Sequence, residues 1–158
     1  MDADPGQAPV PSGEDFLAAF DAFAQAVRRA RGAPAKDRPG SLTLSQYALL
    51  QALSGTEAAR VRDLAIDAGI APSTATRILD ALERRAIVRR SRSVEDRRGV
   101  TVTLTDLGRE TLSRQDAWVR GRQRVFYDEL PATERALVPD LLVRLAALID
   151  ELAAGSEG

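Results

Sequence analysis

The chain has 158 residues, of which 44% are hydrophobic and 28% are charged, a composition typical of a soluble globular protein. It contains no cysteine and no histidine, which excludes disulfides, Cys/His zinc sites, thiol nucleophiles and imidazole bases. The net charge of -1 argues against an indiscriminate nucleic-acid coat.

The N-terminal segment carries no sign of export or membrane insertion. Residues 1–13 are acidic and rich in proline and glycine, whereas a secretory signal needs positive charge followed by an apolar block. No run of about 18 apolar residues indicates a membrane span. We therefore expect residues 1–13 to form a disordered tail, residues 14–158 to form a single domain, and the protein to be cytoplasmic without a membrane partner.

Apolar residues at spacings of four, three and four predict a first helix over residues 14–31. These residues are Phe16, Phe20, Phe23 and Val27. A second helix of about three turns starts at Thr43 or Ser45 as N-cap and ends near Gly55. Its predicted buried face consists of Tyr47, Leu49, Leu50 and Leu53.

The next segment outlines a helix-turn-helix. A short third helix over residues 62–68 is stopped by Gly69, and a fourth helix begins with Pro72 in its first turn, where the missing N–H costs nothing. Residues 87–92 and 100–104 are β-prone runs on either side of a charged stretch. They predict a β-hairpin wing directly after the helix-turn-helix.

Two further helices complete the predicted fold. Thr105 is the expected N-cap of a long helix, and Pro131 starts a last helix with a long leucine stripe, a face suited to pairing with a second copy. The expected fold class is mainly α with a small β-hairpin wing (α+β). A winged helix-turn-helix lobe over residues 42–104 is joined to dimerisation helices at 14–31 and 105–152.

The fourth helix separates two kinds of residue at 100° per residue. One side collects Ala75, Ile78, Leu79 and Leu82; the other presents Ser73, Arg77, Asp80 and Arg84, flanked by Thr74 and Thr76. Small hydroxyl residues let a helix start approach DNA phosphates and base edges, and arginine can pair bidentately with guanine. The candidate major-groove residues are therefore Ser73, Thr74, Thr76 and Arg77. Taken singly, Ser73 is equally well explained as an ordinary polar residue at a helix start.

Charge is concentrated in the same region. Residues 60–104 hold ten arginines and six carboxylates, a net charge of +4, and all of the excess lies between Arg77 and Arg98. A basic patch on an otherwise acidic chain indicates a DNA-facing surface. The predicted wing tip contains Asp96, Arg97 and Arg98, and arginine at such a tip can enter a narrow minor groove. The alternative is a solvated, charge-rich turn.

The stretch from Leu42 to about Leu112 resembles the MarR family of transcriptional regulators. The resemblance rests on LTLSQYALL, APSTATRILDALERRAIVRR, EDRR and VTLTDLGRE, in this order. It implies a triangular homodimer whose two lobes bind a pseudo-palindrome in double-stranded DNA, and whose DNA binding a small ligand or an oxidant weakens. By motif position it places Ser73, Thr74, Thr76 and Arg77 in the major groove, and Arg98, supported by Asp96, in the minor groove.

The absence of cysteine departs from family members that sense peroxides, so a small-molecule effector is expected, such as a phenol or an aromatic acid. Apolar side chains of the first, second and fifth helices, with one arginine, would line its pocket.

We expect a homodimeric repressor without cofactor, metal or catalytic residues. A winged-helix module that binds another protein is the alternative. An enzyme would depend on the carboxylate pair Asp63 and Asp67, which lacks a catalytic partner.

Overall fold

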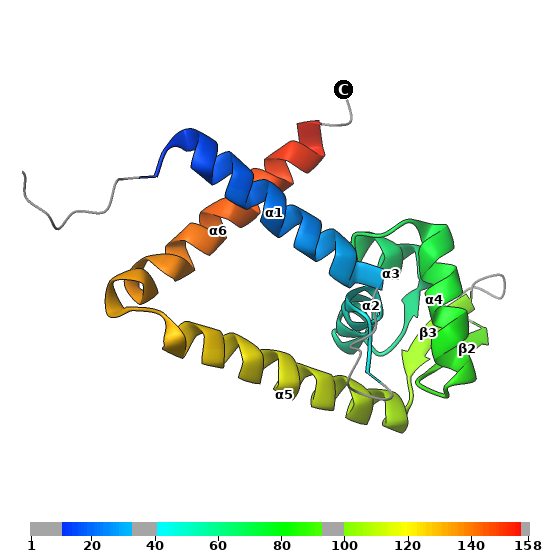
Figure 1. The fold of residues 1–158 in the computed structure, drawn as a ribbon. Coiled ribbons are helices and arrows are strands. Elements are labelled where there is room, and N and C mark those ends of the chain that lie inside the picture. The colour runs from blue at the N-terminus through cyan, green and yellow to red at the C-terminus, as the bar shows by residue number, and fades with distance from the viewer. Residues whose placement is uncertain (1–10, 33–40, 93–99, 156–158) are drawn as a thin grey trace, which may run out of the picture. The chain divides into compact units, whose positions relative to one another are not determined.

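The computed structural model describes residues 11–32, 41–92 and 100–155. The helices are α1 (Gly13–Gly32), α2 (Leu44–Ser54), α3 (Val61–Asp67), α4 (Pro72–Arg84), α5 (Asp106–Glu129) and α6 (Ala132–Ala154), and the strands are β1 (Ala59–Arg60), β2 (Val88–Arg92) and β3 (Val100–Leu104) (Figure 1). The predicted class, mainly helical with a small β-structure, is confirmed. The chain forms two compact units, residues 1–115 and 116–158, and α5 runs from the first into the second.

The start of α2 is fixed by a capping box. The Gln46 N–H donates to the Thr43 hydroxyl at 3.2 Å, and the Thr43 N–H donates to the Gln46 side-chain oxygen at 3.0 Å, so both ends of the box satisfy amides that the helix leaves free. Of the two N-caps predicted from the sequence, Thr43 is the observed one. The other, Ser45, donates its hydroxyl to the Arg31 carbonyl at 3.0 Å and so connects α2 with α1.

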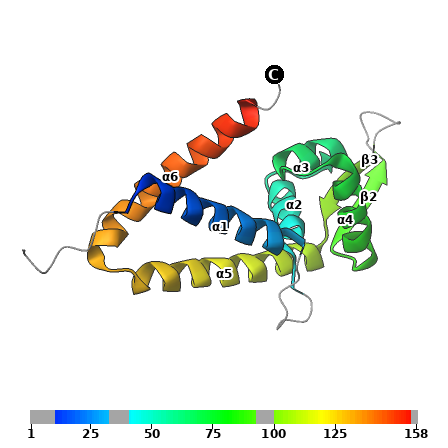
Figure 2. The same cartoon turned by 45° about the horizontal axis from the view of Figure 1, so that its top comes forward.

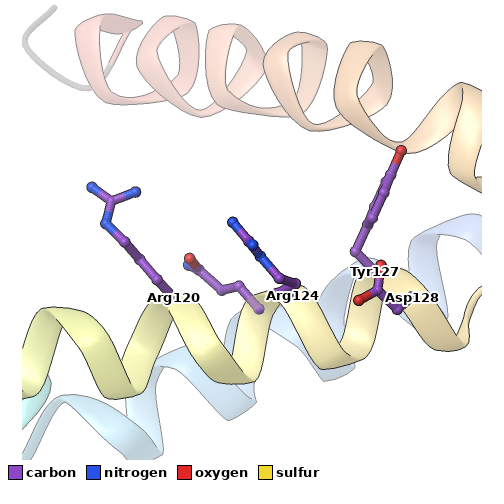
Figure 3. A pocket seen from close by; sticks show the side chains of 5 residues that line it. Arg120, Arg124, Tyr127 and Asp128 are labelled. Atoms are coloured by element: carbon purple, nitrogen blue, oxygen red, sulfur yellow. The ribbon is translucent and has the colours of Figure 1, made fainter.

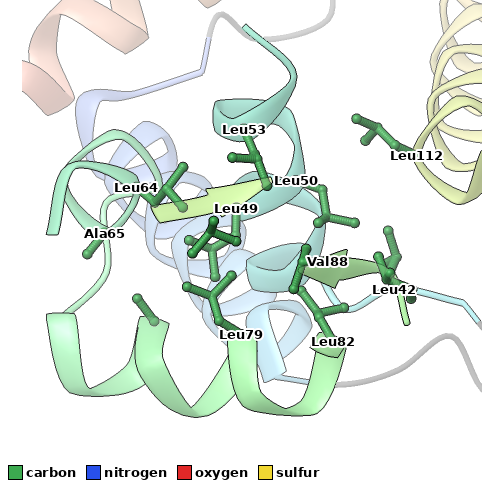
Figure 4. Packing of buried hydrophobic residues seen from close by; sticks show 13 residues of the cluster. Leu42, Leu49, Leu50, Leu53, Leu64, Ala65, Leu79, Leu82, Val88 and Leu112 are labelled. Carbon is green, nitrogen blue, oxygen red and sulfur yellow. The ribbon is translucent and has the colours of Figure 1, made fainter. Parts of the chain in front are cut away.

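The hydrophobic core of the first unit lies between α2, α3, α4 and the sheet (Figure 4). Its fully buried large side chains are Leu49, Leu50, Leu53, Leu64, Leu79, Leu82 and Val102. Each such leucine contributes about 2 kcal/mol by leaving water. Leu112, in the first half of α5, is buried in the same core. The start of α5 therefore packs as part of this unit.

The turn between α3 and α4 follows the sequence prediction. Gly69 has a φ of 62°, a left-handed conformation that glycine adopts without steric cost. The Ile70 N–H donates to the Ala65 carbonyl at 3.0 Å and closes the end of α3. Pro72 occupies the first turn of α4. The turn therefore sets where α4 begins and which of its sides faces the core.

The three strands form an antiparallel sheet in the order β1-β3-β2. The predicted hairpin strands are confirmed, with Val88 opposite Leu104 and Arg92 opposite Val100. Strand β1, which pairs Ala59 with Val102, is absent from the sequence prediction because two residues carry no measurable alternation. In Figures 1 and 2 the sheet lies beside α4.

The first turn of α5 is held against the start of β2. The Thr105 hydroxyl accepts the Gly108 N–H at 2.9 Å, which confirms Thr105 as the cap, and it donates to the Ala86 carbonyl at 2.6 Å. A Cβ at Gly108 would lie 2.0 Å from the Ile87 carbonyl oxygen. Only glycine allows this close approach of helix and strand backbones.

Gly108→Ala should therefore lower the free energy of unfolding by about 3 kcal/mol, since the added methyl group forces two backbones apart. Gly121→Ala, in the same helix, is the matched control, because nothing lies within 4 Å of its ideal Cβ and alanine favours helix by about 1 kcal/mol. Urea unfolding at one fixed protein concentration measures both. Equal effects of the two substitutions would show that the contact at Gly108 does not constrain the fold.

Candidate nucleic-acid interface

Helix α4 presents a buried side and an exposed side, as its sequence predicts. Ala75, Leu79 and Leu82 are completely buried, and Ile78 packs against the core. The four candidate residues lie on the other surfaces of the helix, where Ser73, Thr76 and Arg77 are exposed and Thr74 is half-buried. The apolar packing therefore leaves the candidate residues accessible from outside.

Three of the candidates meet at the start of α4. Ser73, Thr74 and Arg77 line a surface hollow of about 370 Å³. The fourth, Thr76, donates its hydroxyl to the Pro72 carbonyl at 3.0 Å, so this hydroxyl is engaged within the helix. The N-cap residue, Ala71, makes no side-chain hydrogen bond to the first turn. Amides at such a helix start are suited to an incoming phosphate.

Asp80 has a partner that the sequence analysis missed. It lies on the exposed side of α4 in the sequence prediction, and the structure places its carboxylate 2.5 Å from the Arg90 guanidinium of β2. The same guanidinium lies 3.1 Å from the carboxylate of Glu83. The alternation of β2 held a signal for this contact, because Val88 is buried and Arg90 shares its side of the strand.

The wing candidates Asp96, Arg97 and Arg98 lie outside the described residues. The sheet register pairs Arg92 with Val100, so residues 93–99 connect two paired strand ends. Both ends are exposed, as is Arg89 on β2. The role of the tip residues in DNA binding remains a prediction.

The second unit carries a separate polar hollow of about 650 Å³ along α5. Its lining consists of Arg120, Gln123, Arg124, Tyr127 and Asp128. In Figure 3 Arg120, Arg124 and Tyr127 lie on the side of α5 that faces α6. Among the described residues, neither arginine of this hollow is ion-paired. The hollow has the chemistry to accept an anion.

The parts of the chain that the structure describes contain no group of three or more acidic residues placed to hold a metal ion. Within the same ranges, no helix has the length and apolar character to cross a membrane. The carboxylates of Asp63 and Asp67 are exposed on α3.

Comparison with known proteins connects this architecture with transcriptional regulators. Residues 42–100 match the family model described as MarR family. Over 65 residues the chain is 38% identical to the uncharacterised HTH-type transcriptional regulator YfiV of Bacillus subtilis, a match that covers 41% of this chain and 41% of YfiV. The chain thus matches less than half the length of this relative.

Two solved structures resemble nearly the whole chain. The PcaV transcriptional regulator from Streptomyces coelicolor has a TM-score of 0.67 and 26% identity, with 89% of this chain and 99% of PcaV covered; PcaV has also been solved with its natural ligand. BpsR of Bordetella bronchiseptica, whose DNA binding is regulated by 6-hydroxynicotinic acid, has a TM-score of 0.61 and 23% identity, with 84% of this chain and 98% of BpsR covered.

A helix-turn-helix followed by the paired strands β2 and β3 defines a winged helix-turn-helix fold. Over residues 42–100 the chain is similar to the MarR family, and its fold is similar to that of the regulator PcaV. The MarR family regulators that this chain resembles are DNA-binding transcription factors.

We predict that Arg77→Ala lowers the affinity for a DNA operator by about 1–3 kcal/mol and relaxes base preference at one position, because the predicted bidentate contact between Arg77 and guanine would be lost. Arg114→Ala is the control, since Arg114 is exposed on α5 and paired with Glu110. Anisotropy titrations against a set of single-base operator variants measure both effects. Uniform weakening across all variants would assign Arg77 to a phosphate contact.

Proposed function

We propose that the protein is a homodimeric repressor that binds a pseudo-palindromic operator in double-stranded DNA and is released by a small-molecule ligand. The observation that carries the proposal is the exposed start of α4, where Ser73, Thr74 and Arg77 surround one hollow. This start lies in the segment of +4 net charge, residues 60–104. A regulator of this kind acts in the cytoplasm, where its DNA is found.

The proposed contacts divide between the two grooves. Ser73, Thr74, Thr76 and Arg77 enter the major groove, where base edges can be told apart. Arg98, held by Asp96 and accompanied by Arg97, enters the adjacent minor groove and reads its width. Two recognition helices in successive major grooves would lie about 34 Å apart, so a dimer would occlude a promoter sterically.

Exposed apolar side chains outside the lobe support the homodimer. Helix α6 has no buried residue, although its leucine stripe follows a single face. The exposed large apolar residues of α1, the second half of α5 and α6 include Phe16, Leu17, Phe23, Trp118, Val125, Phe126, Leu137, Leu141, Leu148 and Leu152. A monomer rarely leaves so much apolar surface in water. A second copy would cover it with the same helices in an isologous interface.

An aromatic acid or phenol is the proposed class of effector. The DNA binding of BpsR is regulated by 6-hydroxynicotinic acid, an aromatic acid, and the fold similarity to BpsR makes the same class the first to test here. The proposed pocket is lined by apolar side chains of α1, α2 and α5, with an arginine as counter-charge for the carboxylate. Ligand binding would release DNA by changing the separation or tilt of the two lobes.

The operator proposal predicts specific, salt-sensitive binding to DNA upstream of the protein's own gene. An anisotropy titration compares this duplex with a scrambled duplex of equal length at two salt concentrations. We expect two protomers per site and an affinity that falls steeply with salt, because several arginines replace counterions on the phosphates. Equal binding to both duplexes at every salt concentration would favour the alternative, a winged-helix module that binds another protein.

The dimer proposal predicts that Leu141→Arg with Leu148→Arg gives a monomer, because both charges would lie on the exposed apolar stripe of α6. Light scattering measures the mass of each variant. Asp150→Arg is the control, because at 100° per residue position 150 lies on the opposite side of the helix. A leucine double variant that keeps the dimer mass would place the interface elsewhere.

A further inference from the structure

Arg90 makes an ionic connection between strand β2 and the recognition helix α4. Its guanidinium donates to Asp80 Oδ1 at 2.5 Å and to Glu83 Oε2 at 3.1 Å. A longer contact, 3.4 Å, reaches the Thr76 carbonyl. One arginine thus contacts three successive turns of α4.

The backbone of β2 takes part in the same connection. The Arg90 N–H donates to Glu83 Oε1 at 3.2 Å, so Glu83 holds both the backbone and the side chain of this residue. Strand β2 lies at the edge of the sheet, where amides on the outer side lack a strand partner. The side chain of Arg90 is 23% exposed, whereas Asp80 is 43% and Glu83 39% exposed. The cation therefore lies deeper than the two carboxylates that it binds.

The position of Asp80 makes this charge arrangement relevant to DNA binding. At 100° per residue, Asp80 lies on the same side of α4 as Arg77 and Arg84, within about one turn of each. A free carboxylate there would repel the phosphates that the arginines attract. Asp80 instead accepts a hydrogen bond from the Arg90 guanidinium of β2, which brings a positive charge beside this carboxylate.

We propose that Arg90 is a positioning residue for DNA binding: its positive charge offsets one of the two negative charges of Asp80 and Glu83 and holds both carboxylates against β2, so that less negative charge competes with the arginine and hydroxyl groups of α4. The inference rests on the proposed DNA-binding function. Arg90 could instead contact a phosphate directly or serve folding alone. The proposed role differs from both, because the effect of Arg90 on DNA binding then depends on the carboxylates of Asp80 and Glu83.

The test uses four full-length variants and the operator duplex. Arg90→Gln exposes the two carboxylates. Arg89→Gln removes the same charge from the preceding residue of β2, which is exposed and lies on the other side of the strand. Asp80→Asn with Glu83→Gln removes the carboxylates and keeps Arg90, and the triple variant combines these changes with Arg90→Gln. Circular dichroism and thermal unfolding establish that each variant is folded at the titration temperature.

We expect Arg90→Gln to weaken operator binding roughly tenfold at low salt and Arg89→Gln by less than about threefold, with the difference shrinking as salt screens the carboxylates. The triple variant should bind within about threefold of the parent, and the carboxylate double variant at least as tightly as the parent. Recovery in the triple variant excludes a direct phosphate contact by Arg90. The salt dependence excludes a purely structural role.

Two results would overturn the inference while leaving the proposed function intact. One is a triple variant as weak as Arg90→Gln, which would assign Arg90 to the phosphates. The other is a folded carboxylate double variant that binds more weakly than the parent, which would mean that the geometry of the connection matters and not its charge; this result is decisive even if Arg90→Gln does not fold. A parent protein without preference for the operator would overturn both the inference and the proposed function.

Discussion

The burial of one side of α4 is the constraint on which the proposed DNA-binding surface depends. Ala75, Leu79 and Leu82 are completely buried against the core of the first unit, and the two leucines together contribute about 4 kcal/mol by leaving water. These buried residues fix the rotation of the helix about its axis. Ser73 and Arg77 therefore lie on its exposed side. The polar composition of that surface would have no consequence for DNA binding if the helix were free to rotate.

A second set of contacts fixes α4 and the wing strands as one body. Arg90 connects β2 with α4 through two carboxylates, and Thr105 and Gly108 hold the start of α5 against the end of the α4–β2 connection. Polar contacts therefore connect β2 and the start of α5 to the rest of the lobe, whereas apolar packing stabilises the centre of the lobe. In the proposed mechanism, a ligand moves the lobe as a unit, because separating its parts would break these contacts.

The sequence allowed the prediction of the helices, the hairpin strands and the two sides of α4, because each is encoded by local spacing or by a cap such as Thr43 or Thr105. It did not allow the prediction of β1, which has two residues, or of the contact between Asp80 and Arg90, which are ten positions apart on a helix and a strand. The alternation of β2 places Arg90 on the same side of the strand as the buried Val88, but which residue of α4 it meets depends on how the two elements pack. Local patterns do not predict the ligand pocket for the same reason, since its proposed walls come from α1 and α2 and from α5, which is distant from them in sequence.

The central claim, that the start of α4 faces DNA, can be tested directly because the chain has no cysteine. A single Ser73→Cys substitution provides a unique thiol at the proposed surface, and Ser113→Cys provides a second, exposed thiol on α5 as control. The rate of maleimide labelling is measured for each variant, free and saturated with the operator duplex. We predict that DNA slows labelling at position 73 strongly and leaves position 113 unaffected. Unchanged labelling at position 73 in a complex that anisotropy shows to be saturated would contradict the proposed interface.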